Sequence, residues 1–368
     1  MPNYISDNTG YEVDSIIDSF NHFRKTIIVH CLSGSTVTVS NGQETYTKVS
    51  TTTELVFNPK AYGVYNITCL YNGTTQIESL EIDKVRIYEV FFSGDVDAYL
   101  TFRSANQFSL STANSTKNWN GTIEYSTDKE LWNTWDGTTA LNSINNILYL
   151  RGIGNSYISG APNYTNWNLV GTNIYCSGNI ETILDYQTVE DGNHPTMSNW
   201  CYENLFNGCT SLITAPELPA TTLSIGCYGS MFMNCTSLIT APELPATTLS
   251  ARCYENMFWN CTSLTTAPSL PATTLSGYCY SSMFVRCTGL TTPAILPATT
   301  LAESCYQSMF LQCSNIKLYT SSGIGTTEYR IPSSGTGVWA TDALTDMFNQ
   351  TGGDYATWTP IINTTYYY

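Results

Sequence analysis

The carboxy-terminal half of the chain repeats one pattern of apolar and polar positions. Each copy reads approximately Cys-Tyr-x-x-Met-Phe-x-x-Cys-Thr-Ser-Leu-x-x-Ala-Pro-x-Leu-Pro-Ala-Thr-Thr-Leu. In each copy the first Cys, the Met (Leu205 in the first copy) and the second Cys stand at i, i+4 and i+8, which is typical of the apolar face of a short helix. The following piece carries two prolines and is predicted to be extended. Copies start 26 residues apart, at Cys201, Cys227, Cys253, Cys279 and Cys305.

A helix and an extended piece this small can bury their apolar faces only against neighbouring copies. Repeats of 20–29 residues are typical of the leucine-rich class. The pattern therefore predicts an α/β leucine-rich-repeat solenoid over residues 176–368, with a cap at each end. Residues 176–200 are the expected first cap. Residues 338–368 are the expected last cap, because Ala343, Met347 and Phe348 repeat the apolar stripe without its cysteines.

The amino-terminal segment, residues 1–24, is predicted to hold one docking helix. Thr9 and Glu12 fit a capping box. An apolar face follows at i, i+3, i+4 and i+7, formed by Val13, Ile16, Ile17 and Phe20. A single short helix is unstable alone in water. It is expected either to pack on the next domain or to mediate anchoring and self-association, for example as a trimer.

Residues 25–92 are predicted to form an immunoglobulin-like β-sandwich. Runs rich in β-branched residues are separated by Asn41-Gly42 and Asn72-Gly73, which favour two-residue hairpin turns. The stretch from Gly63 to Cys69 resembles a late strand of an immunoglobulin-like domain, although Cys69 follows Tyr65 by four residues instead of two. Cys31 and Cys69 can face each other there, as two buried thiols (the favoured reading) or as a disulfide.

Residues 93–175 are predicted to form a second β-rich domain. The strand-like runs are 100–102, 121–126 and 147–151, and Trp132 and Trp135 flank a turn that ends at Asp136-Gly137. The Tyr-Ser-Thr-Asp and Leu-Arg-Gly pieces are similar to a module that precedes this repeat type in bacterial and phage proteins.

The charge balance narrows the classes of partner. Only 12% of residues are charged, and the net charge is 14 − 29 = −15. Nucleic acid is therefore not expected as a partner, since binding phosphates requires clustered Lys and Arg. An anionic membrane surface is disfavoured in the same way. No stretch approaches the ~18–20 apolar residues of a membrane span. The first ten residues lack the features of a secretory signal, so we expect either assembly in a cytoplasm or a removed signal.

No catalytic, cofactor or metal motif stands out. The sequence has no phosphate-binding loop, no His-Glu-x-x-His and no Gly-x-Ser-x-Gly. Ten of the 13 cysteines belong to the repeats, where they are expected to be small buried hydrophobes. The three histidines lie outside the repeats, and His194 is expected in a surface turn. The repeat-borne acids Glu217 and Glu243 are expected to be solvated. We therefore expect no enzyme, no cofactor and no metal.

Two rows of the repeats are candidate contact surfaces. The residue after each Phe forms a row that is apolar in four copies, at Met233, Trp259, Val285 and Leu311. It forms either half-buried spacers or an exposed apolar strip for protein contact. A second row of hydroxyls either faces solvent or binds a glycan, and consists of Thr214, Thr240, Thr266 and Thr292.

The repeat motif resembles that of the BspA-like leucine-rich-repeat family, whose Ala-Phe-x-x-Cys-x-x-Leu core corresponds here to Met-Phe-x-x-Cys-Thr-Ser-Leu. That family implies adhesion at bacterial surfaces and also occurs in gut bacteriophage genomes. The Thr-Gly-Tyr-Glu-Val-Asp start is similar to segments of phage fibre and baseplate proteins. We therefore expect a non-enzymatic virion protein that contacts other virion proteins or a host-surface protein or glycan. The alternative is a bacterial cell-surface adhesin.

Overall fold

The structure, a computed structural model, describes residues 6–7, 10–13, 26–30, 35–40, 45–49, 51, 54–57, 64–71, 74–83, 87–92, 99–113, 115–160, 164–322, 325, 327–331, 334–335, 340–353, 359–361 and 364–368. The chain forms two compact units, Met1–Asp97 and Ala98–Tyr368. The finer four-part division made from the sequence stays a prediction.

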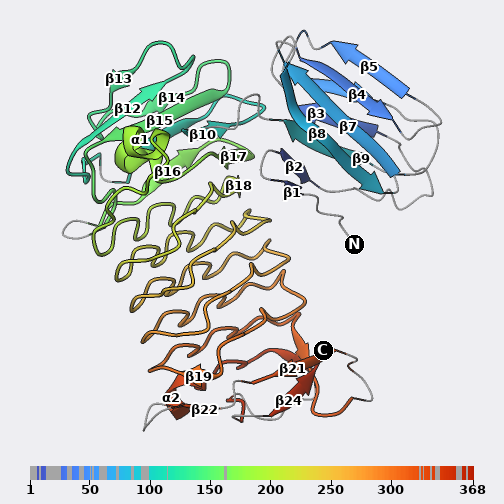
Figure 1. Cartoon of the computed structure of the whole chain (residues 1–368), viewed down its shortest axis with the longest axis vertical. Coiled ribbons are helices and arrows are strands. Elements are labelled where there is room, and N and C mark those ends of the chain that lie inside the picture. Colours follow the sequence, from blue (N-terminus) through green and yellow to red (C-terminus); the bar gives the residue numbers. More distant parts are fainter. Residues whose placement is uncertain are drawn as a thin grey trace. The chain divides into compact units, whose positions relative to one another are not determined.

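The first unit consists of two β-sheets (Figure 1). The five-stranded sheet has the order β1-β2-β9-β3-β6, and the four-stranded sheet has the order β5-β4-β7-β8. All neighbouring strands are antiparallel except β3 and β9, which are parallel. The strands are β1 (Ser6–Asp7), β2 (Gly10–Val13), β3 (Thr26–His30), β4 (Thr36–Ser40), β5 (Thr45–Val49), β6 (Glu54–Phe57), β7 (Val64–Tyr71), β8 (Thr74–Asp83) and β9 (Ile87–Phe92).

The predicted amino-terminal docking helix is wrong. Glu12 and Val13 belong to strand β2, where they pair with Val90 and Glu89 of β9. Pairing with β9 holds these residues in an extended conformation, whereas a helix this short is not stable alone in water. The other members of its predicted apolar face, Ile16, Ile17 and Phe20, lie outside the described residues, as does Cys31.

Alternation of apolar and polar residues explains the interior of the first unit. In β4, Val37 and Val39 are fully buried, whereas the Thr and Ser residues between them are half-buried. This period of two places the valines on one face of the strand. Val29, Phe57 and Ile67 are the other apolar side chains described as buried in this unit.

The second unit begins with two further sheets, and the first repeat continues one of them. The six-stranded sheet has the order β13-β12-β15-β10-β17-β18, and the three-stranded sheet has the order β14-β11-β16. Strand β18 belongs to the first repeat and lies parallel to β17. The strands are β10 (Leu100–Arg103), β11 (Ser109–Thr112), β12 (Thr122–Ser126), β13 (Asn133–Thr134), β14 (Leu141–Asn142), β15 (Ile147–Ile153), β16 (Trp167–Val170), β17 (Ile174–Ser177) and β18 (Leu212–Thr214).

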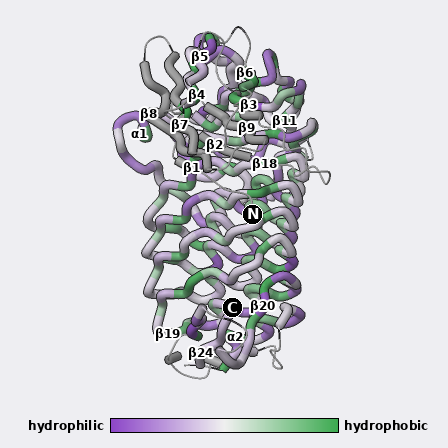
Figure 2. Tube along the Cα trace, turned by 90° about the vertical axis from the view of Figure 1, so that its right-hand side faces the viewer, coloured by the Kyte–Doolittle hydropathy of each residue, from purple (hydrophilic) through white to green (hydrophobic). Residues whose placement is uncertain are grey.

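The repeats form a column of stacked coils, one coil for each copy (Figures 1 and 2). Along residues 252–261 the backbone N–H groups alternate between two kinds of acceptor. Even-numbered residues donate to the next coil, as from Tyr254 to the carbonyl of Cys279 at 3.0 Å. Odd-numbered residues donate within their own coil to the carbonyl three residues earlier, as from Met257 to Tyr254 at 3.2 Å. Every N–H in this stretch therefore has a partner, as burial requires.

A left-handed residue at every fourth position produces this alternation. In the third copy these residues are Arg252, Asn256 and Asn260, with φ of 60°, 56° and 61°. The other copies have positive φ at the same positions. An α-helix cannot contain such residues at this spacing, because all of its residues have negative φ. The chain therefore forms a series of tight turns whose alternate N–H groups point along the column.

The predicted fold class is therefore wrong. We expected an amino-terminal helix, an immunoglobulin-like domain, a second β-rich domain and an α/β leucine-rich-repeat solenoid. The structure is mostly β, with several small sheets, and its repeats are stacked turns without a helix. The only α-helices among the described residues are α1 (Thr182–Glu190) and α2 (Ala340–Leu344), and both lie outside the five copies.

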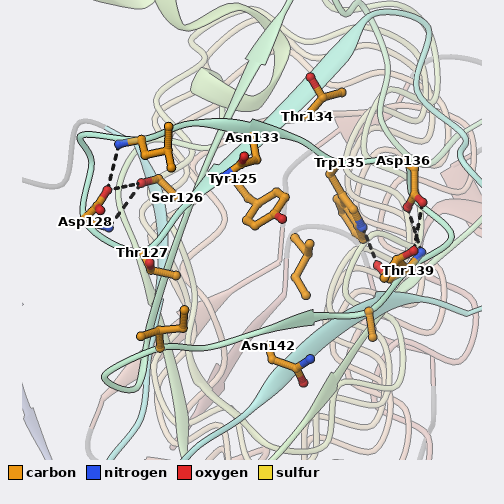
Figure 3. A pocket seen from close by; sticks show the side chains of 14 residues that line it. Tyr125, Ser126, Thr127, Asp128, Asn133, Thr134, Trp135, Asp136, Thr139 and Asn142 are labelled. Atoms are coloured by element: carbon orange, nitrogen blue, oxygen red, sulfur yellow. Dashed lines mark hydrogen bonds between the residues drawn. The ribbon is translucent and has the colours of Figure 1, made fainter.

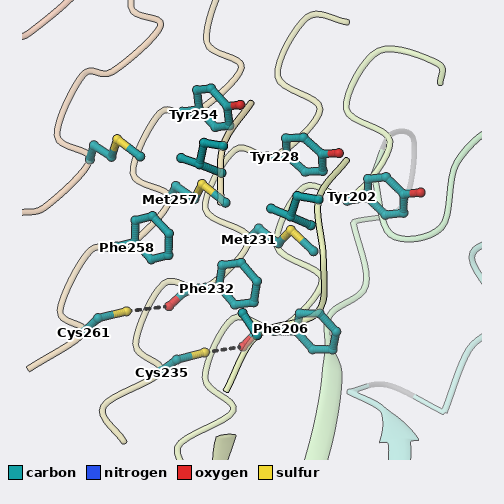
Figure 4. Close-up of a cluster of buried hydrophobic side chains, with 14 of the residues drawn as sticks. Tyr202, Phe206, Tyr228, Met231, Phe232, Cys235, Tyr254, Met257, Phe258 and Cys261 are labelled. Atoms are coloured by element: carbon teal, nitrogen blue, oxygen red, sulfur yellow. Dashed lines mark hydrogen bonds between the residues drawn. The ribbon is translucent and has the colours of Figure 1, made fainter. Parts of the chain in front are cut away.

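Stacked side chains fill the column (Figure 4). The Tyr of each copy lies on the Tyr of the next, with ring centroids 5.6–5.9 Å apart. The Phe residues stack in the same way at 5.4–5.7 Å. Ring planes within each stack differ by only 3–12°. The 26-residue period thus places identical rings above one another.

The second Cys of each copy links neighbouring coils. Its thiol donates a hydrogen bond to the carbonyl of the Phe in the preceding copy, for example from Cys261 to Phe232 at 3.1 Å. The other three such bonds measure 2.8–3.1 Å. In the first copy, Cys209 donates to Trp167 of β16 at 3.1 Å. These cysteines are therefore hydrogen-bond donors as well as small buried side chains.

Both ends of the column are covered by aromatic residues of the same unit. At the first end, Phe102 and Trp167 pack edge-on against Phe206 at 6.1 and 6.0 Å. At the last end, Phe348 stacks on Phe310, and Tyr329 packs edge-on against Phe348 at 6.0 Å. The remaining strands are β19 (Thr300–Leu301), β20 (Lys317–Leu318), β21 (Glu328–Arg330), β22 (Ser334–Gly335), β23 (Gly352–Gly353) and β24 (Thr365–Tyr367).

Removing one ring from the middle of the Phe stack should destabilise the column. Phe258 is fully buried, so Phe258→Ala is expected to lower the free energy of unfolding by about 3–5 kcal/mol. Urea unfolding followed by circular dichroism measures this change. Thr273→Ala, at an exposed position of the same copy, is the matched control and should cost less than about 0.5 kcal/mol. A cost below about 1 kcal/mol for Phe258→Ala would contradict the stack as described.

The eleven cysteines of the second unit should be inert in the folded chain and open to alkylation after unfolding. All eleven are buried and none forms a disulfide, and burial raises the pKa of Cys209 and of Cys227 to about 12. Because the thiolate is the reactive form, iodoacetamide at pH 8 should leave them unmodified. In denaturant without reductant, peptide mass mapping should find all eleven alkylated. Unmodified residues there would reveal disulfides instead.

Candidate functional site

The second unit contains a pocket of about 580 Å³ between the edges of its six-stranded and three-stranded sheets. Strand β13 is the edge of the six-stranded sheet, and β14 is the edge of the three-stranded sheet. Loops 127–132 and 135–140 complete the walls. Figure 3 shows the ring of Tyr125 in the middle of the pocket, with Trp135 beside it and Asn142 across from it. The volume is in the range of small-molecule sites, about 300–1,000 Å³.

Two aspartates fix the loops around this pocket. Oδ1 of Asp128 accepts bonds from the N–H groups of Glu130 and Leu131, at 2.9 and 3.0 Å. Asp136 does the same for Thr138 and Thr139, both at 2.8 Å. Such Asx-type turns are a local property of Asp in loops. These backbone hydrogen bonds hold the pKa of both carboxyl groups below the usual value, so both are ionised at neutral pH.

The pocket presents amide and aromatic groups. Tyr125 of β12 lies directly opposite Asn133 of β13 in the strand register, so both side chains are on one face. Asn133 and Asn142 are exposed, whereas Trp135 is buried and its Nε1 donates to the carbonyl of Thr139 at 2.8 Å. Since the two carboxylates hold the loops, the amides are the polar groups best placed for a ligand.

Sequence reasoning did not predict this pocket. It singled out Trp135 and the turn after it, but it assigned them no binding role. The residues come from three short strands of two different sheets. The only local signal is the pair of aspartates that begin loops, Asp128 and Asp136, and such residues mark turns in most proteins.

The predicted hydroxyl row is only partly accessible. Thr214 is buried, and its hydroxyl donates to the carbonyl of Cys176 at 2.9 Å. Thr240 is half-buried, whereas Thr266 and Thr292 are exposed. Parallel bridges join Thr214 to Thr240 and Thr240 to Thr266. The structure thus brings three members together, and exposure increases along the row.

The predicted apolar row offers little free surface. Met233, Trp259 and Leu311 are half-buried, and Val285 is only 1% exposed. Asn207, which occupies the same position in the first copy, is also half-buried. The row therefore presents partly covered side chains and not a continuous apolar strip.

The row of residues after each Tyr contains a strained carboxylate. Burial, and next the negative charge of Glu255, raise the pKa of half-buried Glu203 to about 7. Oε2 of Glu203 is buried without a hydrogen-bond partner. Glu255, unlike Glu203, has a charged partner. Nη1 of Arg252 donates hydrogen bonds to both carboxylate oxygens of Glu255, at 2.9 and 2.8 Å. A glycine, Gly229, stands between the two acids in this row.

His194 has a structural partner. Its Nδ1 lies 2.7 Å from Oε2 of Glu181, and Glu181 is only 1% exposed. Burial raises the pKa of Glu181, and His194 partly offsets that effect. The neighbouring sequence acids Asp185, Glu190 and Asp191 are not its partners here. Of the other repeat-borne acids, Glu243 is exposed and Glu217 half-buried.

The described residues contain neither a metal-binding cluster nor a membrane-spanning helix. No group of three or more His, Cys, Asp or Glu residues is placed to hold a metal ion in this part of the chain. Its helices are also too short and too polar to cross a bilayer.

Comparison with known protein families, with characterised proteins and with solved structures gives no match for this chain.

Replacing the strained carboxylate should stabilise the protein at high pH only. The pKa of Glu203 in the folded chain, about 7, exceeds its ordinary 4.5, so the fold favours the protonated form. Stability is then lost as pH rises from about 4.5 to about 7. The free energy of unfolding of Glu203→Gln should match that of the parent chain near pH 4 and exceed it by about 3 kcal/mol near pH 8.

Urea unfolding at the two pH values tests this prediction. Glu130→Gln, in an exposed loop position, is the control and should shift stability equally at both. If Glu203→Gln gives the same difference from the parent at pH 4 and pH 8, the strain at Glu203 is absent.

Proposed function

We propose that this chain is a non-enzymatic structural and adhesion protein of a bacteriophage particle. Its column of coils would present a contact surface to a host-surface molecule or to another virion protein. The observation that carries the proposal is the distribution of differences among the five copies.

Three rows of the column differ in every copy, and two of them directly adjoin a buried Cys or Phe. The residue before each first Cys is different in all five copies, and so is the residue after each Phe. We call these the variable rows, and their members are Trp200, Gly226, Arg252, Tyr278 and Ser304, then Asn207, Met233, Trp259, Val285 and Leu311.

Exposure alone does not explain where the copies differ. The Thr-Thr pairs 221–222, 247–248, 273–274 and 299–300 are fully exposed, yet they are identical in four copies. In the variable rows, Gly226, Val285 and Ser304 are buried and the other members are half-buried. These rows nevertheless carry aromatic, aliphatic, charged and polar side chains. A rigid frame with a varied face is what selective recognition requires.

The interior of the column indicates that the column is a rigid scaffold. Its backbone N–H groups are bonded within and between coils, and its rings stack in two continuous series. Because each coil is held by both neighbours, the varied side chains keep fixed relative positions. Binding to such a surface loses little conformational entropy.

The thiols support assembly in a reducing compartment, as for a particle built inside a host cell. Eleven cysteines are buried thiols outside any disulfide, and in four neighbouring pairs of copies the S–H group is a hydrogen-bond donor that a disulfide would remove. The resemblance of the repeat motif to BspA-like proteins, some of them encoded by phages, points the same way.

Locating the protein tests the proposal. Antibodies against the full chain should label purified phage particles in electron micrographs, and mass spectrometry of those particles should find the chain. Labelling of the producing bacterium's outer surface, with none on particles, would favour the cell-surface adhesin. Labelling of neither would refute both.

The role of the variable rows requires a separate binding measurement. Fluorescently labelled full chain should bind cells of the host strain in flow cytometry. The double variant Trp259→Ala, Tyr278→Ala, on neighbouring coils, should weaken binding at least about tenfold, as loss of aromatic anchors does at interfaces. The control double variant Thr247→Ala, Thr273→Ala should bind like the parent. Equal binding by both double variants would show that the variable rows are not the contact surface.

A further inference from the structure

We infer that the pocket between β12, β13 and β14 is a binding site for a neutral saccharide. This inference concerns the β-sheets before the repeats and does not depend on the function proposed for the variable rows. It stands on the shape of the pocket, the chemistry of its walls and its charge.

The walls combine apolar faces with free amides. Tyr125, Trp135 and Leu141 form an apolar side, and Figure 3 shows the Tyr125 ring turned into the pocket. Asn133 and Asn142 stand at the exposed edges of the two sheets. A pyranose ring has the matching character, with an apolar C–H face and a rim of hydroxyls.

Amide side chains suit hydroxyl ligands in particular. Each amide offers two donor hydrogens and an acceptor oxygen, while each sugar hydroxyl is both a donor and an acceptor. Asn133 and Asn142 can therefore bind hydroxyls without leaving a polar group unpaired. Since they come from two different sheets, they approach a ligand from two sides of the pocket.

The pocket is already formed before a ligand enters. Ser126 and the N–H groups of residues 130 and 131 bind Asp128, and residues 138 and 139 bind Asp136. These bonds hold the two wall loops in fixed turns. A preformed site loses less entropy on binding than a flexible one.

The charge of the walls selects against acidic sugars. No Lys, Arg or His is among the lining residues, whereas Asp128 and Asp136 are, and both are ionised at neutral pH. A uronate or a sialic acid would therefore meet two negative charges with no cation to offset them. A neutral sugar meets no such repulsion.

The surroundings allow more than one sugar unit. A second hollow of about 270 Å³ shares Asn142 with the pocket and is lined also by Gln107, Phe108, Ser109 and Val170. The exposed side chains of Leu131 and Ile144, 65% and 58% accessible, border the main pocket. They would cover the apolar face of an adjoining unit.

Saturation-transfer NMR and calorimetry on the full chain test this inference. The probes are glucose, galactose, mannose, N-acetylglucosamine and the disaccharides lactose and cellobiose. Glucuronic acid and glucosamine serve as the acidic and basic counterparts. At least one neutral probe should bind with a Kd of roughly 0.1–10 mM, and glucuronic acid should bind at least tenfold more weakly than its neutral counterpart glucose.

Variants assign the binding to this pocket. Asn133→Ala and Asn142→Ala should each weaken it at least fivefold, while Tyr125→Phe, which keeps the ring, should weaken it less. Thr273→Ala on the repeats is the control and should leave binding unchanged. Circular dichroism confirms that each variant is folded.

Three results would overturn the inference. These are no binding of any neutral probe at tens of millimolar, stronger binding of glucuronic acid or glucosamine than of every neutral probe, and full binding by both folded amide variants. Because none of these measurements involves the variable rows or particle labelling, failure here is distinguishable from failure of the proposed function.

Discussion

The repeat column depends on one constraint, that every buried backbone N–H must find an acceptor. In residues 252–261 alternate N–H groups bond within a turn and to the next coil. This arrangement replaces both the α-helix, which bonds only within itself, and the β-sheet, which bonds only between strands. It requires a left-handed residue at every fourth position, and Asn, Ser or Gly occupies most of these. All other regularities of the column follow from this backbone.

Coils that bond along the column place equivalent side chains above one another. The Tyr and Phe stacks and the thiol-to-carbonyl bonds are therefore consequences of the backbone register as much as of apolar burial. The same register lines up the variable rows. A side chain in these rows can differ from copy to copy because it contributes little to the hydrogen bonds and ring stacks that join the coils. The same backbone therefore carries Trp259, Val285 and Leu311 at equivalent positions.

The pocket does not depend on the repeats, because all of its lining residues lie before them in the chain. Two sheet edges and two loops meet, and each loop is held by its own aspartate. Both charged groups are used to shape the walls, so recognition is left to Asn133, Asn142 and Tyr125. Strained groups elsewhere, such as Glu203, lie on the column and outside this pocket.

The sequence alone determined the repeat period and the residues of the apolar stripe, because periodicity is a local property of the chain. It could not determine the fold of a copy. Cys, Met and Cys at i, i+4 and i+8 fit a helix, and only the hydrogen bonds to the next coil show that the chain forms turns instead. The recurring Asn256 and Asn260, which adopt left-handed φ, were the local indication of turns that the prediction missed. Likewise Glu12 and Val13 fit a helix until pairing with β9 is seen. The pocket was decided entirely by tertiary structure, since Tyr125, Asn133 and Asn142 meet only where two sheets end.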